Sequence, residues 1–339
     1  MKRAAVVLAL VVTVLILAAA GSAIYLAKQL EPAEPGSTEQ IAFTVGRGSG
    51  LRQIANALEA SGIIRNADAA VILARLRSLG SSLKAGEYDL SPGQATEDVL
   101  LRLVSGRVRT YTVVLPEGIR SHQIATRLEA AGLADREELL RAINDAELAR
   151  SLGVPADNLE GYLYPETYEI PGDLSAEAVV GILVAQFEKV WGEIAPEARK
   201  LALAKHEIVT LASIVEKETA APEERGLIAA VFLNRLRKGM RLETDPTVIY
   251  GIPNFDGNLR RRHLQDKSNL YNTYQIAGLP PGPIASPGAD ALRAVVNPAE
   301  TQYLYFVSRN DGTHAFSSTY REHVNAVNRY QRRGRRSSK

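Results

Sequence analysis

The chain has 339 residues, an ordinary globular composition with 46% hydrophobic and 23% charged residues, and a formal net charge of +2. Its length suggests about two folded domains, and the near-neutral charge gives no reason to expect a nucleic-acid partner. The chain has no cysteine, which excludes disulfides, thiolate catalysis, cysteine-ligated metals and a lipid-modified cysteine.

Residues 1–27 predict a cytoplasmic N-terminus followed by a transmembrane anchor. Lys2 and Arg3 precede an uncharged, mostly apolar run over residues 4–26, and about 20 apolar residues span a bilayer as a helix. The basic pair places the N-terminus in the cytoplasm and the remainder outside it. The small residues of "AAAGSA" also suit a cleaved signal peptide, which is the alternative. In both cases the bulk of the chain works outside the cytoplasm.

Residues 28–39, rich in Pro, Gly and acidic side chains, predict a linker. A weak internal repeat follows within residues 40–139: "FTVGRGSGLRQIANALEASG" resembles "YTVVLPEGIRSHQIATRLEAAG". Each copy has a β-prone start, a turn and a helix that should end at Gly62 or Gly132. We therefore expect two small strand-helix units packed together.

Residues 140–330 predict a second, largely helical domain, and residues 331–339 a solvated basic tail. Helices are expected over 175–190, 206–219, from about 222 to 239 and over 289–296, with a strand at "TQYLYFVS" and a final helix. Residues 240–290 are rich in Pro, Gly, Asn and Tyr and show little periodicity. A long irregular segment inside a compact domain is usually functional.

Two glutamates, Glu216 and Glu218, stand near the end of the predicted helix 206–219. At about 100° per residue, Glu218 shares a face with the larger aliphatic residues, and Glu216 lies about 160° away among smaller ones. A carboxyl held against apolar surface has a raised pKa and can act as a general acid. The alternative is an ion-paired or exposed glutamate at a helix end.

Other chemistries find little support in the sequence. "HEIVT" at His206 begins like a zinc-binding H-E-x-x-H motif but lacks the second histidine. "VGRGSGLR" lacks the third glycine of a dinucleotide loop, and no phosphate-loop or nucleophile-elbow motif occurs. We therefore expect no metal and no cofactor.

Four stretches together resemble the endolytic murein transglycosylase, or YceG-like, family. They are "ASIVEKETA", "VFLNRLRKGMRLETDPTVIYG", "YNTYQIAGLPPGPIASPGADAL" and the pair "YLYFV" with "GTHAFSSTYREH". The resemblance covers nearly the whole chain. It implies an α+β fold with a single N-terminal transmembrane helix, a small LysM-like strand-helix module and a lysozyme-like catalytic domain.

The resemblance also implies site residues. In lysozyme-like lytic transglycosylases, a glutamate followed by Ser or Thr at a helix end is the catalytic acid, and Glu218-Thr219 fits that pattern. "YNTY" resembles a motif that lines the glycan cleft, so Tyr271, Asn272 and Tyr274 are candidate sugar ligands, with packing of the loop as the alternative. Asn234 and Asp245 are further candidates for binding or orientation, with helix capping and internal hydrogen bonds as the alternative.

The implied reaction is cleavage of the β-1,4 bond between N-acetylmuramic acid and N-acetylglucosamine in nascent glycan strands. Glu218 would serve as acid and then as base, leaving a 1,6-anhydro end and terminating strand elongation. The expected partners are peptidoglycan strands, the inner (cytoplasmic) membrane and peptidoglycan synthases, with a periplasmic or otherwise extracytoplasmic catalytic domain. Two alternatives remain: a hydrolase using Asp245 or Glu166 as second carboxylate, and a non-catalytic wall-binding scaffold.

Overall fold

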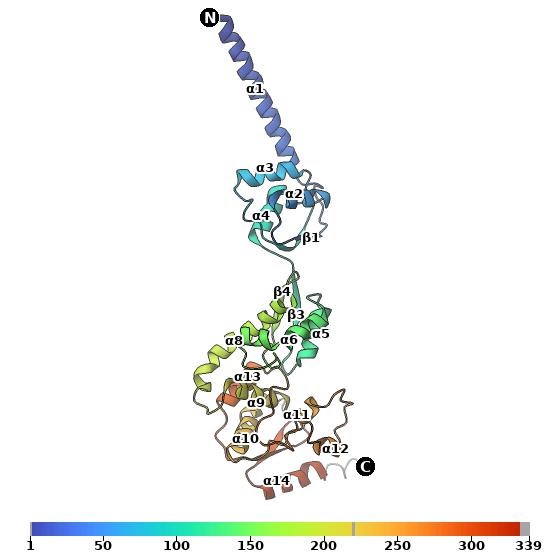
Figure 1. Ribbon diagram of the computed structural model, residues 1–339, viewed down its shortest axis with the longest axis vertical. Helices are drawn as coiled ribbons and strands as arrows, with labels where there is room; N and C mark the ends of the chain where they lie inside the picture. The colour runs from blue at the N-terminus through green and yellow to red at the C-terminus, as the bar shows by residue number, and fades with distance from the viewer. Residues whose placement is uncertain (1, 219–220, 333–339) are drawn as a thin grey trace. The chain divides into compact units, whose positions relative to one another are not determined.

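The computed structural model describes residues 2–218 and 221–332, where the strands form three two-stranded sheets among many helices (Figure 1). This is the α+β class that the sequence predicts. The chain divides into two compact units. The first runs to Tyr111 and includes Pro171–Asp173, and the second holds the remainder. The division between the two units falls within strands β3 (Thr110–Val114) and β4 (Thr167–Pro171), which pair with each other.

The first unit begins with α1 (Lys2–Gln29), which is long and apolar enough to cross a membrane. Its stretch Val6–Gln29 has a mean hydropathy of 2.7. The elements that follow have the order β-α-α-β-α: β1 (Ile41–Val45), α2 (Leu51–Ala60), α3 (Ala67–Leu76), β2 (Gly86–Leu90) and α4 (Thr96–Ser105).

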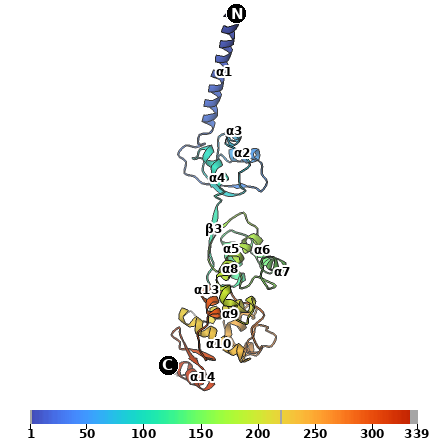
Figure 2. The ribbon, with the colours of Figure 1, turned by 90° about the vertical axis from the view of Figure 1, so that its left-hand side faces the viewer.

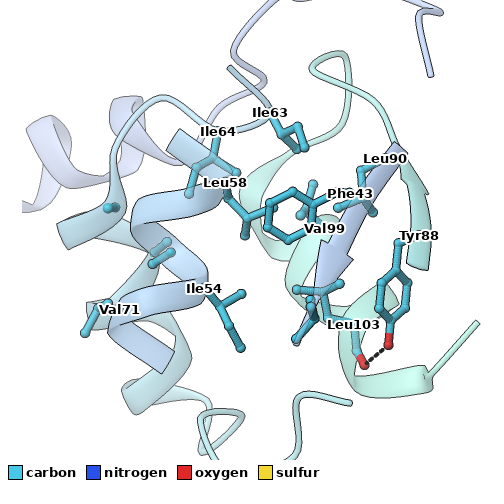
Figure 3. Packing of buried hydrophobic residues seen from close by; sticks show 14 residues of the cluster. Phe43, Ile54, Leu58, Ile63, Ile64, Val71, Tyr88, Leu90, Val99 and Leu103 are labelled. Carbon is cyan, nitrogen blue, oxygen red and sulfur yellow. Dashed lines mark hydrogen bonds between the residues drawn. The ribbon is translucent and has the colours of Figure 1, made fainter. Parts of the chain in front are cut away.

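The core of the first unit lies between the β1–β2 pair and its helices (Figure 3). The two strands are antiparallel, with Phe43 opposite Tyr88, and every second residue faces the core. Ile54 and Leu58 of α2 and the apolar side of α4 fill the space against the strands. The buried Tyr88 hydroxyl donates to Lys84 O at 2.8 Å, so the core contains no unsatisfied phenol.

Residues 28–39 are bonded to the first unit along much of their length, so they are not a free spacer. The amide of Thr96 donates to Leu30 O at 3.0 Å, and the amide of Glu34 donates to Pro92 O at 2.9 Å. Arg65 Nε donates to Pro32 O at 2.8 Å. Backbone groups thus hold this segment although its composition is typical of a linker.

The two copies of the internal repeat adopt the predicted strand-turn-helix form, but the division of the chain places them in different units. The first copy is β1 with α2, and the second is β3 with α5 (Ser121–Ala130). Gly62 and Gly132 follow their helices with φ of 73° and 81°. Glycine adopts this left-handed conformation without a Cβ penalty, so the prediction that both helices end there is confirmed.

The second unit is built on helices α9, α10 and α13, which pack against one another (Figures 1 and 2). Helix α8 also packs on α13 and is longer than predicted, while α13 matches its predicted bounds. The strand predicted at "TQYLYFVS" contains β5, which forms a hairpin with an unpredicted strand, β6. The elements of this unit are α6 (Arg136–Ile143), α7 (Ala146–Ser151), α8 (Ala176–Ala198), α9 (Lys205–Glu218), η1 (Pro222–Glu224), α10 (Arg225–Arg237), α11 (Asp245–Tyr250), α12 (Arg261–Leu264), α13 (Ala289–Val296), β5 (Tyr305–Ser308), β6 (His314–Ser317), α14 (Tyr320–Val327) and η2 (Asn328–Arg332), beside α5.

Candidate active site

Helix α9 is buried on all sides over residues 208–215. The predicted contrast between a face of large aliphatic residues and a face of small ones is therefore not a contrast in burial. The two glutamates differ instead in what surrounds the last turn of the helix. Thr219, which completes the motif of the resemblance, lies outside the described residues.

Glu216 has the environment of a structural ion pair. Its side chain is only 6% exposed, and it lies 3.4 Å from the Arg225 guanidinium. Its other oxygen accepts a hydrogen bond of 3.0 Å from the amide of Gly288, directly before α13. Arg225 also lies 3.6 Å from both Glu117 and Asp290. Buried charges are normally paired in this way, and Glu216 thereby ties α9, α10 and α13 together.

Glu218 has a different environment, although it is only two residues further on. It is half-buried and lines a cavity of about 470 Å³. Its carboxyl accepts a hydrogen bond from the Thr244 hydroxyl. Within residues 2–218 and 221–332, no cation forms an ion pair with it. Its carboxyl is therefore held by a neutral donor.

The pKa of Glu218 is raised to about 7, chiefly because the surrounding protein excludes water from the carboxyl. The hydrogen bond from Thr244 lowers this pKa, the negative charge of Asp245 raises it, and His314 lowers it. A carboxyl with a pKa near neutrality is protonated in a large fraction of molecules at physiological pH. It can then give up a proton and take one back.

Helix α9 supplies Glu218 to the cavity, and the other walls come from several elements. Helix α10 and the segment before α11 contribute one side, the β5–β6 hairpin another, and α14 closes the end. The lining residues are Glu218, Arg235, Leu242, Glu243, Thr244, Asp245, Tyr274, Leu304, Tyr305, Phe306, Val307, Ser308, His314 and His323. In the described part of the chain, no group of three or more His, Cys, Asp or Glu side chains is placed to hold a metal ion.

Of the candidate ligands named from the sequence, Asp245 and Tyr274 lie in the cavity with Glu218. The Tyr274 hydroxyl donates to Asp245 Oδ1 at 2.8 Å. Burial and the charge of Asp245 raise the pKa of Tyr274, so the phenol stays a donor. The pair places two polar side chains on one wall of the cavity.

Asn272 and Tyr271 occupy other places. Asn272 is fully buried, and its Nδ2 donates to the carbonyls of His263 and Asp266 at 3.1 and 2.7 Å. Its Oδ1 accepts from the amide of Tyr274 at 3.1 Å, so the whole amide is engaged within the loop. Tyr271 packs on Tyr250 with ring centroids 4.6 Å apart and lines a separate cavity. The structure thus does not bring either side chain to Glu218. The reason is that both are used to fold the irregular segment.

Asn234 also lies away from the cavity. Its Nδ2 donates to Thr301 O and Tyr303 O at 2.9 and 3.0 Å. Arg235, its neighbour, does reach the cavity wall, where it donates to Leu304 O at 2.7 Å and to Leu242 O at 3.0 Å. Arg235 thus connects α10 to the backbone of two cavity walls, whereas Asn234 connects α10 to the segment before β5. Internal hydrogen bonding, the alternative considered for Asn234, accounts for its contacts.

Sequence reasoning gave no weight to His314, which the fold brings to Glu218 from 96 positions further along the chain. Thr244, which directly precedes the candidate Asp245, is the side chain bonded to Glu218. No local pattern marks either residue, because both contacts depend on how distant segments pack.

Comparison with known proteins identifies the family of the chain. A model of the YceG-like family matches residues 43–329. The chain belongs to the YceG-like family. A Bacillus subtilis relative, 30% identical over 326 residues with 91% of this chain and 90% of the relative covered, is named endolytic murein transglycosylase. A Streptococcus pneumoniae relative of the same name is 29% identical, covering 84% of this chain and 57% of the relative.

A solved structure extends the comparison to the fold. The crystal structure of a YceG-like protein from Listeria monocytogenes aligns with a TM-score of 0.58 and 32% identity. The alignment covers 85% of this chain and 99% of the Listeria chain. The family is therefore supported both by sequence and by the arrangement of the elements.

Proposed function

We propose that this chain is an endolytic murein transglycosylase that cleaves the bond between N-acetylmuramic acid and N-acetylglucosamine within nascent glycan strands. One observation carries the proposal: the Glu218 carboxyl, with its pKa raised to about 7, lies in an open cavity without a cationic partner among the described residues. The names of the Bacillus and Streptococcus relatives support the same reaction.

In the proposed mechanism Glu218 begins protonated and donates to the glycosidic oxygen as the bond to the muramic anomeric carbon breaks. The N-acetylglucosamine side leaves with a free 4-hydroxyl. The Glu218 carboxylate then removes the proton from the muramic 6-hydroxyl, whose oxygen attacks the anomeric carbon and closes a 1,6-anhydro ring. No water is consumed, and Glu218 ends protonated. A pKa near neutrality suits one group for both transfers.

The neighbours of Glu218 support the two halves of this cycle. Asp245 disfavours the carboxylate and so keeps the acid protonated before the first transfer. The hydroxyl of Thr244 donates to the carboxyl and so favours the charged form that the first transfer creates. Asp245 and Tyr274 are the proposed sugar-binding side chains of the cavity, and Glu218 is the proposed catalytic residue.

The first unit is the proposed LysM-like, glycan-binding module. Strands β1 and β2 pair with each other, and helices α2 and α3 lie between them in the chain, which supports this assignment. Helix α1 is the proposed single-pass anchor in the inner (cytoplasmic) membrane, with the chain that follows α1 outside the cytoplasm, and its length and hydropathy support that role. An anchored enzyme is positioned to act on strands as synthases make them.

The second unit is the proposed lysozyme-like domain.

A hydrolase with a second carboxylate is the main chemical rival. Glu166 is exposed and is not among the residues that line the Glu218 cavity, whereas Asp245 is. Asp245 accepts from Tyr274, so a role as base would require it to release this bond or share it. The distinction rests on the product, because a transglycosylase forms a product lighter by one water than a hydrolase does.

The test is mass spectrometry of purified, uncross-linked glycan strands after incubation with the full-length protein in detergent or nanodiscs. We expect internal cuts and 1,6-anhydromuramic ends that depend on Glu218. Reducing muramic ends would identify a hydrolase instead, and intact strands would identify a scaffold. Glu218→Gln, which keeps the shape of the side chain, is the matched inactive control.

A further inference from the structure

His314, a side chain that lines the cavity, is held by a buried carboxylate. Its backbone amide donates to Glu224 Oε1 at 2.8 Å, and its ring Nδ1 lies 2.6 Å from Glu224 Oε2. One carboxylate therefore engages both the backbone and the ring of the same residue. The side chains of His314 and Glu224 are 13% and 9% exposed, so this contact is shielded from water.

The ring has little freedom beyond this contact. Phe306 packs against it edge-on with centroids 5.4 Å apart, and Phe316 lies 6.4 Å away. His314 opens strand β6, while Glu224 ends the short helix η1, six residues after Glu218 in the chain. The short helix η1 is thus connected directly to strand β6, whose His314 lines the cavity.

The chemistry of the contact sets the state of the imidazole. A carboxylate accepts hydrogen bonds, so Glu224 fixes Nδ1 as a donor. The other nitrogen, Nε2, forms no hydrogen bond within residues 2–218 and 221–332. The ring thus lines the same cavity as Glu218 while Glu224 holds its Nδ1 edge.

We propose that Glu224 and His314 form a dyad that supports the negative charge which Glu218 acquires when it gives up its proton. His314 is a positioning and electrostatic residue, and Glu224 acts through it. This inference rests on the proposed function, since it concerns the carboxylate form of Glu218 between the two proton transfers. Preorganised charge near a developing anion is among the largest catalytic effects available to a protein.

Several charged and titratable groups share the cavity with Glu218, and the test must separate His314 from them. They come from α10, the segment around α11, the loop after α12 and α14: Arg235, Glu243, Asp245, Tyr274 and His323. Only His314 is paired with a buried carboxylate outside the lining set. The direction of its effect on Glu218, which lowers the pKa, is opposite to that of Asp245.

The decisive variant is His314→Asn. The asparagine amide reproduces the Nδ1–H donor to Glu224 but has no group at the position of Nε2, so the contact with Glu224 is retained while Nε2 is lost. We expect kcat for anhydro-product formation to fall roughly 10- to 100-fold, below the loss of roughly 10²–10⁴-fold typical of removing a general acid. We expect KM to change little and the alkaline limb of the kcat/KM profile to move to higher pH.

Glu224→Gln provides the second measurement, because it removes the charge behind the imidazole and keeps one of the two acceptor oxygens. We expect a smaller fall in kcat than for His314→Asn, measured well below the melting temperature of the variant. His122→Asn, on α5 and not in the cavity, is the matched control and should leave both limbs of the profile in place.

The outcomes are distinguishable from failure of the proposed function. If wild type forms no anhydro product, the proposed function fails and the profiles have no meaning. If wild type forms it and His314→Asn shifts the alkaline limb at a normal melting temperature, the dyad is supported. An unshifted limb, or a fall in activity that only follows a fall in melting temperature, would overturn the dyad while leaving the transglycosylase intact.

Discussion

The surroundings of Glu216 and of Glu218 are two regions of one helix end that treat the same side chain in opposite ways. Around Glu216, Arg225 and the Gly288 amide neutralise a buried carboxylate. Around Glu218, a threonine hydroxyl, an aspartate and a histidine replace the cation, and the pKa rises to about 7. The arginine beside Glu216, rather than the extent to which each side chain is buried, therefore distinguishes this structural glutamate from the candidate acid Glu218.

The largest expected effect is on activity. Glu218→Gln should abolish strand cleavage, because the amide neither gives nor takes the proton. Loss of general acid catalysis alone costs roughly 10²–10⁴-fold, and the same group is also the proposed base. Release of anhydro-ended fragments, with thermal melts alongside, measures this. Glu216→Gln is the matched variant and should keep appreciable turnover. A dead Glu216→Gln beside an active Glu218→Gln would reverse the assignment.

The next effect is on stability and falls on the other glutamate. Glu216→Ala leaves Arg225 with its exposed neighbours Glu117 and Asp290 and removes the acceptor of the Gly288 amide. Breaking a buried ion pair costs about 3–5 kcal/mol, so the free energy of unfolding should fall by roughly that amount at most. Urea denaturation of the detergent-solubilised chain measures it. If Glu216→Ala is as stable as wild type, the ion pair does not hold the three helices together.

A third effect concerns stability and pH together. The pKa of Glu218 rises from 4.5 to about 7 on folding, so its contribution to stability is present below about 4.5 and is lost as pH rises to about 7. Glu218→Gln removes this dependence. The variant should therefore gain stability relative to wild type across that range, by on the order of 3 kcal/mol at most. Parallel melts at pH 5 and pH 8 test the sign, and a constant difference between the two proteins would show that folding does not perturb this carboxyl.

Some features of the fold and of the site could be predicted from the sequence, and others could not. Helix positions followed from apolar periodicity, and the glycine stops after α2 and α5 followed from the left-handed backbone that ends a helix. Glu218 is singled out by the helix face that it shares with aliphatic residues and by the glutamate-threonine motif of the resemblance, and its catalytic role stays a prediction. The hydrogen bond from Thr244 and the presence of His314 in the same cavity could not be predicted, because these residues come from segments that reach α9 only through tertiary packing. Asn272 and Tyr271 matched a motif by residue type, yet their side chains serve the loop itself.

The smallest expected effect sharpens the comparison at Asp245. Asp245→Asn removes the negative charge that raises the pKa of Glu218, while its side-chain oxygen can still accept from Tyr274. The pKa of Glu218 should fall, so the acid form should be lost at lower pH. The alkaline limb of kcat/KM should therefore move to lower pH, opposite to the shift expected for His314→Asn.

Asp245→Asn also tests the rival chemistry at the same site. A transglycosylase with Glu218 as its only catalytic carboxyl should keep substantial turnover at acidic pH in this variant, because protonated Glu218 remains available there. A hydrolase that uses Asp245 as its second carboxylate should lose turnover at every pH, since no pH restores a carboxylate to asparagine. The profile measured from pH 4 to pH 9, with product masses recorded at each point, separates a displaced curve from a flattened one. A flattened curve with reducing ends would reject both the single-carboxyl mechanism and the electrostatic role given to Asp245.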